Sequence, residues 1–401
     1  MSEIGDVKVK ALILGAGRIG RGFVTGLLWK NEVDITFFEY NDALVKSMNE
    51  RKSYTIHVLG DESKNTVVHG YQAYSIAEQE ALVREWESAD FIFTAVGGKN
   101  LTTVAKLLAD AFQASAKPEG MYYKNIVTCE NWIEPASKLQ AAILDALPEG
   151  SREAFVKHIG VSESVVMATG AAAPPNTDLK NPVDTWVQDF WYLPVDRERI
   201  LGEVPAWQYF DFIDGFADLL QQKIYTNNTS VALIAYLGYL KGHVYVADAA
   251  NDPEIVPILE EAYREINAAL IHGLGVTEES QLKFSKRAKE KYQDRNIIDL
   301  VVRIARDPIR KLKPSDRLIG PAQLALKTGT TPKAIALAIA AALYFDYEED
   351  EDAVNLTNMR KEHGARKVLQ EICEISEEDV LYKLILDSRQ ILKDKGWLKG
   401  E

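Results

Sequence analysis

The chain has 401 residues, of which 47% are hydrophobic and 26% are charged, a composition typical of a globular protein with two domains. Its net charge of −13 argues against a nucleic-acid backbone or an anionic membrane as partner. The two cysteines are far apart and the first ten residues contain no apolar signal core. We therefore expect no disulfide framework and a cytoplasmic location.

The first 130 residues alternate between short apolar runs and segments with helical spacing. Strands are expected at 9–14, 34–40, 91–96 and 125–129. Helices are expected at 20–30, 41–51 and 101–112. The runs 54–59 and 66–74 are separated by Gly-Asp-Glu-Ser-Lys-Asn and are expected to form a β-hairpin. Because strands that alternate with helices form parallel sheets, residues 1–200 are predicted to be a doubly wound, Rossmann-type α/β domain.

Beyond residue 200, helical spacing dominates. Helices are expected at 210–223, 230–245, 255–273, 279–292, 297–304, 332–344 and 379–393. The domain boundary is placed within 197–205, so that residues 201–401 form an all-helical domain. The longest apolar stretch, 334–345, is too short to span a bilayer and is predicted to be a buried helix. The acidic run 347–352 is predicted to be a surface loop.

A glycine-rich motif directly follows the first strand and opens the first helix. It consists of Gly15, Ala16, Gly17, Arg18, Ile19 and Gly20. In a dinucleotide-binding turn, the first glycine permits the tight turn, the second lets the backbone approach a pyrophosphate, and the third permits close helix–sheet packing. The N-terminus of the helix offers unpaired N–H groups to the phosphates. The strand–turn–helix context favours a cofactor site over an ordinary glycine turn.

Two further features extend this cofactor prediction. Glu39 ends the second strand, and a carboxylate there accepts ribose hydroxyl protons but repels a 2′-phosphate, which favours NAD over NADP. Val96 and Gly97 follow another strand, where small residues let the backbone run beside a cofactor. The alternatives are an acid at a strand end for Glu39 and a simple turn at 96–97.

The catalytic chemistry is less apparent from composition. The scattered cysteines and histidines do not supply a zinc site, so no metal is expected. None of the 17 tyrosines has a lysine four residues later, which argues against the short-chain dehydrogenase arrangement. A His-Asp proton relay stays open. Lys223 is conspicuous at the start of the helical domain.

At this point the sequence resembles the long-chain polyol dehydrogenase family over nearly its whole length. The segments that carry the resemblance are GAGRIGRGF (15–23), SYTIHVLG (53–60), TAVGG (94–98), CEN (129–131), AYLG (235–238), KGH (241–243) and RDPIRKLKPSDRLIGPA (306–322). The resemblance implies metal-independent hydride transfer between NAD and a polyol or sugar phosphate, of the mannitol 1-phosphate and fructose 6-phosphate type. A lysine acts as acid/base.

The family's lysine is followed by an asparagine after five residues and by a histidine after eight. Lys223 and Asn228 match this pattern, but the third position is Val231. A desolvated lysine can take a hydroxyl proton near neutral pH, and Asn228 and Asn131 can donate hydrogen bonds to an oxygen that gains negative charge. The alternatives are a solvated lysine at a helix end and, for Asn131, a helix cap or turn residue.

Two other regions bear on the substrate. Where the family usually has an Asp-Arg pair before two prolines, this chain has Val166 and Met167. The basic segment 306–317 predicts a phosphate site, with a solvated helix–loop junction as the alternative. Its candidate ligands, together with the nearby histidine, are Arg310, Lys311, Arg317 and His243; His243 is equally interpretable as a packing residue. A divergent enzyme for another polyol or a sugar acid, and a non-catalytic NAD-binding protein, stay as alternatives.

Overall fold

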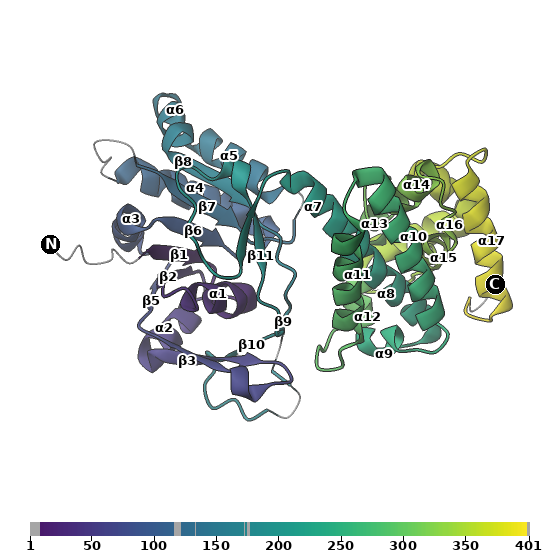
Figure 1. Cartoon of the computed structure of the whole chain (residues 1–401), viewed down its shortest axis with the longest axis horizontal. Coiled ribbons are helices and arrows are strands. Elements are labelled where there is room, and N and C mark those ends of the chain that lie inside the picture. Colours follow the sequence, from purple (N-terminus) through teal and green to yellow (C-terminus); the bar gives the residue numbers. More distant parts are fainter. Residues whose placement is uncertain (1–8, 116–121, 133, 172, 175–176, 399–401) are drawn as a thin grey trace. The chain divides into compact units, whose positions relative to one another are not determined.

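The computed structural model describes residues 9–115, 122–132, 134–171, 173–174 and 177–398 (Figure 1). The chain forms two compact units that divide between Phe216 and Ala217. The last strand before this division, β12 (Phe210–Ile213), pairs with β11 (Leu193–Asp196) and therefore belongs to the first unit.

A six-stranded parallel sheet forms the centre of the first unit. Its strands are β1 (Lys10–Leu14), β2 (Asp34–Glu39), β5 (Gln72–Ser75), β6 (Phe91–Thr94), β7 (Lys124–Thr128) and β8 (Ile159–Glu163). They lie in the order β5-β2-β1-β6-β7-β8, which is the doubly wound order of dinucleotide-binding folds. The order reverses between β1 and β6, so the crevice used for ligands in such folds lies at the carboxyl ends of these two strands.

Helices cover both faces of this sheet (Figure 1). They are η1 (Arg18–Val24), α1 (Thr25–Trp29), α2 (Asp42–Arg51), α3 (Gln79–Ser88), α4 (Leu101–Ala114), α5 (Pro135–Ala146) and α6 (Glu149–His158). Successive residues of β1 point to opposite faces: Ile13 packs in the same apolar cluster as η1, α1 and α2, whereas Leu12 packs with α3, α4 and α5. Burial on both faces explains the nearly continuous apolar runs of these strands.

The predicted β-hairpin is confirmed, but its second strand is shorter than expected. β3 (Ser53–Val58) pairs antiparallel with β4 (Thr66–His69). Gly70, at φ +72°, ends β4, and the residues after it form β5 beside β2 in the central sheet. β3 also pairs with β10 (Thr185–Val187), which in turn pairs with β9 (Gly170–Ala171).

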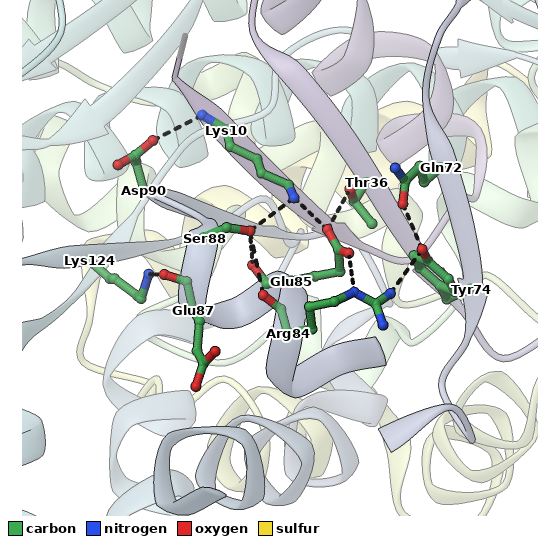
Figure 2. Close-up of polar contacts among 10 residues, drawn as sticks. All are labelled: Lys10, Thr36, Gln72, Tyr74, Arg84, Glu85, Glu87, Ser88, Asp90 and Lys124. Atoms are coloured by element: carbon green, nitrogen blue, oxygen red, sulfur yellow. Dashed lines mark hydrogen bonds and ion pairs between the residues drawn. The ribbon is translucent and has the colours of Figure 1, made fainter. Parts of the chain in front are cut away.

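Charged residues gather at the amino-terminal end of the central sheet, opposite to the carboxyl ends of its strands (Figure 2). The Glu85 carboxylate of α3 accepts hydrogen bonds from the Lys10 amine at 2.5 Å and the Thr36 hydroxyl at 3.3 Å. Burial disfavours its charge, but hydrogen bonds from Lys10 and from Arg84 outweigh burial and hold the pKa of Glu85 below its usual range. This cluster ties α3 to β1 and β2, away from the carboxyl edge of the sheet.

The second unit is helical, as expected. Its elements are α7 (Phe216–Lys223), η5 (Ile224–Asn228), α8 (Thr229–Lys241), α9 (Val246–Ala250), α10 (Val256–Leu274), α11 (Glu278–Gln293), α12 (Val301–Ala305), α13 (Pro308–Lys311), α14 (Ile319–Lys327), α15 (Lys333–Ala342), α16 (Glu351–Glu371) and α17 (Val380–Asp394). None of the helices in the described part of the chain is both long enough and apolar enough to cross a bilayer.

Three expected helices differ from those observed. The helix predicted at 210–223 is wrong at its start, because 210–213 forms β12 and Gly215 at φ +69° separates this strand from α7. The helix predicted at 230–245 ends at Lys241, because Gly242 adopts φ +82°. The one predicted at 297–304 begins only at Val301. The acidic run 347–352 is a loop only as far as Asp350, whose side chain caps α16.

The buried helix predicted at 334–345 is confirmed as α15. Its residues from Ala334 to Ala342 are at most 7% exposed. Glu265 of α10 caps the N-terminus of this helix. Its carboxylate accepts hydrogen bonds from the amides of Ala334 at 2.8 Å and Ile335 at 3.0 Å. Burial raises the pKa of Glu265 to about 7, although these amide hydrogen bonds oppose the shift.

Candidate active site

The glycine-rich turn connects β1 to η1 at the point where the strand order reverses. Gly15 adopts φ +97°, and a Cβ on it would lie 2.5 Å from the Ala95 carbonyl oxygen. A Cβ on Gly20 would collide with the Gly15 carbonyl oxygen. In contrast, a Cβ on Gly17 would meet nothing within 4 Å. Packing therefore requires glycine at 15 and 20, whereas Gly17 borders open space of the kind that a bound pyrophosphate needs.

Glu39 is positioned by the backbone of this turn. Its carboxylate is buried and accepts hydrogen bonds from the Ala16 amide at 2.6 Å and the Asn41 amide at 3.0 Å. The sequence analysis did not identify Arg21, which is buried and donates to the Ala16 carbonyl at 2.7 Å. The turn is therefore held from both sides, and its residues fit a dinucleotide with an adenosine ribose next to Glu39. Arg18 is exposed and Ile19 half-buried at the start of η1.

The turn after β6 is also fixed by a carboxylate. Glu130 accepts hydrogen bonds from the amides of Val96 at 2.9 Å and Gly97 at 2.8 Å. Burial raises its pKa, although both hydrogen bonds oppose the shift. Glu130 was missed by the sequence analysis, although it lies within the CEN segment. Its neighbour Asn131 is exposed just beyond the carboxyl end of β7, so the carboxyl ends of β1, β6 and β7 all carry candidate residues.

In the second unit, Lys223 directly precedes the π-helical turn η5, and Asn228 is its last residue. In this turn the Thr229 amide donates to the Ile224 carbonyl five residues earlier. In a π-turn, residues five apart follow one another by one turn, whereas in an α-helix they are about 1.4 turns apart. The π-turn therefore brings Lys223 and Asn228 toward one face of the helix. Such turns are frequent at functional sites.

The environment of Lys223 favours a neutral amine. Burial, together with the charges of Arg317 and Lys291, lowers the pKa of Lys223 to about 7. Arg317 belongs to the basic segment, and its carbonyl accepts a hydrogen bond from the Thr229 hydroxyl at 2.7 Å. Lys291 lies on α11 and was not identified from sequence, because it is 68 residues away along the chain from Lys223.

The basic residues of 306–317 separate into two groups. Arg310 and Arg317 both pair with Asp316, at 3.3 Å and 2.6 Å, and keep partly exposed guanidinium groups. Lys311 is buried, and its amine donates to the carbonyls of Ile304 and Arg306 at the end of α12. Burial, with the charge of Arg317, lowers the pKa of Lys311 to about 7. Arg310 also pairs with Asp307 at 3.4 Å, so both arginines are held by carboxylates, while Lys311 stabilises a helix end.

The remaining predicted positions lie in packed surroundings. His243 Nε2 is 2.8 Å from Asp252 Oδ2, and Lys241 binds the same carboxylate. Val231 is 9% exposed and belongs to the apolar core of the second unit. Val166 packs against the apolar core of the first unit, and Met167 is buried. Among the described residues, no group of three or more His, Cys, Asp or Glu side chains is placed to hold a metal ion.

Family models match both units. The mannitol dehydrogenase Rossmann domain matches residues 9–209, and the mannitol dehydrogenase C-terminal domain matches residues 217–389. The chain belongs to the mannitol dehydrogenase family. The expected α/β domain and helical domain are the two domains of this family.

Relatives in this family match most of the chain. Mannitol-1-phosphate 5-dehydrogenase of Bacillus pumilus is 34% identical over 379 residues, which cover 94% of this chain and 99% of the relative. The enzyme of the same name from Thermoanaerobacter pseudethanolicus is 30% identical over 390 residues, 96% and 98% of the two chains. Among solved structures, Pseudomonas fluorescens mannitol 2-dehydrogenase, in a ternary complex with NAD and D-mannitol, matches with a TM-score of 0.74 at 16% identity, covering 98% of this chain and 93% of that one.

Proposed function

We propose that this member of the mannitol dehydrogenase family is an NAD-dependent oxidoreductase that interconverts a polyol phosphate and its keto form, of the mannitol 1-phosphate and fructose 6-phosphate type. The observation that carries the proposal is Lys223, a half-buried lysine at the start of a π-turn, whose pKa is lowered to about 7 by desolvation. Relatives named mannitol-1-phosphate 5-dehydrogenase match nearly the full chain, which supports this substrate class.

The cofactor site belongs to the first unit. Gly15, Gly17 and Gly20 would hold the pyrophosphate of NAD, and the Glu39 carboxylate would accept hydrogen bonds from the ribose hydroxyls. When bound, the nicotinamide supplies the acceptor and donor of the hydride. Glu39 favours NAD because a second negative charge next to its carboxylate would be repelled.

Lys223 carries the proton transfer. The neutral amine takes the proton of the substrate hydroxyl as the alcohol is oxidised, and the protonated amine returns it when the ketone is reduced. A pKa of about 7 keeps both forms populated near neutral pH, which is the condition for a reversible acid/base. The amide of Asn228 donates a hydrogen bond to the same oxygen and stabilises its developing negative charge. Asn131 of the first unit carries a donor of the same kind.

Arg310 and Arg317 supply the phosphate preference in this proposal. A guanidinium binds phosphate oxygens through two parallel hydrogen bonds, and the shared Asp316 holds both side chains in place. Lys311 and His243 are instead engaged by other groups of the protein, the Ile304 carbonyl and the Asp252 carboxylate. We place the enzyme in the cytoplasm, which suits two buried cysteines without a disulfide.

The test is to mix the protein with NADH and fructose 6-phosphate and to follow the absorbance of NADH. Oxidation of NADH with fructose 6-phosphate, and much slower oxidation with fructose, is the expected result. A panel of phosphorylated and unphosphorylated ketoses and sugar acids then addresses the second candidate, a divergent substrate, which the apolar Val231, Val166 and Met167 favour. If NADH binds but no substrate in the panel is reduced, the protein is a non-catalytic NAD-binding member and the proposal fails.

A further inference from the structure

A buried network of amide side chains surrounds the turn that carries Lys223. Gln281 of α11 is fully buried, and it is the centre of this network. Its Oε1 accepts a hydrogen bond from Gln222 Nε2 at 2.9 Å. Its Nε2 donates to the Thr226 hydroxyl at 3.0 Å and to Asn267 Oδ1 at 2.9 Å. One side chain therefore links three helical segments through three hydrogen bonds.

The position of these bonds along the chain is specific. Gln222 directly precedes Lys223, and Thr226 lies in the middle of η5, so Gln281 binds one side chain before Lys223 and one after it. The neighbouring residues of η5 are held in the same way: Tyr292 of α11 donates its hydroxyl to the Asn227 carbonyl at 3.0 Å. Two side chains of α11, Gln281 and Tyr292, thus hold the π-turn by hydrogen bonds.

Packing alone does not require such a network. The surrounding core of the second unit is apolar, and apolar side chains of similar volume fill a core at least as well as buried polar groups. A buried amide is costly unless all its groups are paired, and here both N–H groups of Gln281 and its carbonyl oxygen are used. What a directional network adds is a unique geometry for the segment that it holds.

We propose that Gln281 is a positioning residue: through Gln222 and Thr226 it stabilises the π-turn in which Lys223 and Asn228 approach one face, and it keeps the Lys223 amine desolvated. This inference rests on the proposed acid/base function of Lys223. In an α-helical turn the two side chains would diverge, and the amine would be able to reach water. Gln281 itself touches no reacting atom.

The experiment compares three variants of the full-length protein. Gln281→Met keeps the volume and removes all three hydrogen bonds, and Thr226→Val removes only the bond to η5 while keeping its shape. Ser285→Ala is the matched control: Ser285 is also buried on α11, but its hydroxyl donates within the helix, to the Leu282 carbonyl at 3.2 Å. Thermal unfolding of each variant measures what a merely structural role would change.

Two measurements report on Lys223. The first is the pH profile of kcat for ketone reduction; the second is the NMR titration of 13C-methylated lysines, with Lys223 assigned from the Lys223→Gln variant. For Gln281→Met and Thr226→Val we expect kcat to fall about tenfold, with NADH affinity unchanged. The titration of Lys223 should move from about 7 toward the ordinary lysine range. The double variant should lose no more than the worse single variant, because both remove one network.

An unmoved Lys223 titration in both variants overturns the proposal, whatever happens to kcat. So does an equal shift in Ser285→Ala, which would mark a general loosening of α11. If Gln281→Met fails to fold, Thr226→Val decides by the same criteria. The titration needs no turnover, so a moved titration in a protein that reduces no substrate supports the positioning role and refutes only the proposed function.

Discussion

The Glu39 carboxylate accepts a hydrogen bond from the Ala16 amide at 2.6 Å. This contact joins the end of β2 to the glycine-rich turn after β1, so the position of the acid is fixed relative to the turn. A ligand bound at this turn lies next to the buried Glu39 carboxylate, whose orientation is set by hydrogen bonds from backbone amides. The cofactor preference therefore depends on one side chain that can be changed.

Glu39→Gln should reduce the preference for NAD. For the unchanged protein we expect at least about tenfold tighter binding of NAD than of NADP, on the order of 1.4 kcal/mol, because the carboxylate repels the 2′-phosphate. Glutamine removes the charge but keeps an acceptor for the Ala16 amide, so the difference in affinity between NAD and NADP should decrease. Calorimetric titration with both cofactors measures it. Similar affinities in the unchanged protein would refute the role of Glu39.

Lys223→Met should lower turnover by a factor of about 100 or more, because a general acid/base contributes about 10²–10⁴ to the rate. NADH binding, measured by fluorescence, should be unaffected. In the unchanged protein, polyol oxidation should rise as pH increases through about 7, since the amine must be neutral to take a proton. Ketone reduction should fall over the same range. Lys327→Met, an exposed lysine on α14, is the control and should behave like the unchanged protein.

Arg310→Ala should selectively weaken the binding of phosphorylated substrates. Loss of charge-assisted hydrogen bonds to a phosphate should raise KM for fructose 6-phosphate at least about tenfold and leave KM for fructose nearly unchanged. Arg303→Ala, which removes an exposed arginine paired with Asp299, controls for the loss of one positive charge. An equal effect on both substrates would show that the 306–317 segment is structural.

Val231→His tests the position at which this chain departs from its family's pattern. Val231 lies in the apolar core, so an imidazole there should lower the free energy of unfolding by about 1–3 kcal/mol. We also expect a lower kcat on the native substrate, because the surroundings are built for an aliphatic side chain. Urea unfolding and steady-state kinetics measure both, with Val231→Ile as control. A higher kcat for Val231→His would instead show that the unchanged protein lacks a hydrogen bond to its substrate at this position.

Glu265 should make stability depend on pH. In the folded protein burial raises its pKa to about 7 from the ordinary value of 4.5, so between these values the folded state retains a proton that the unfolded chain has lost. This contribution to stability is complete at low pH and decreases as pH rises toward about 7. Glu265→Gln, which stays neutral, should flatten this part of the profile. Urea unfolding from pH 4.5 to 8 checks it, with Glu279→Gln, an exposed residue on α11, as control.

Local patterns in the sequence were sufficient for the parts of the molecule that depend on near neighbours. Gly15, Gly17 and Gly20 follow a strand and begin a helix, and that context alone indicated a dinucleotide turn, with Glu39 at the end of the next strand. The run 334–345 was identified as a buried helix because it is apolar all round. The parallel sheet followed from the alternation of strand and helix signals.

Tertiary structure decided whatever depends on partners distant in the chain. Residues 210–213 have helical spacing but pair with β11, and 72–75 leave the hairpin to pair with β2, because a strand is stabilised by a neighbour that sequence does not display. The π-turn between Lys223 and Asn228 is likewise held by Gln281, 55 residues beyond Thr226. Burial and the charges of Arg317 and Lys291, which lower the pKa of Lys223 to about 7, act only once these segments meet.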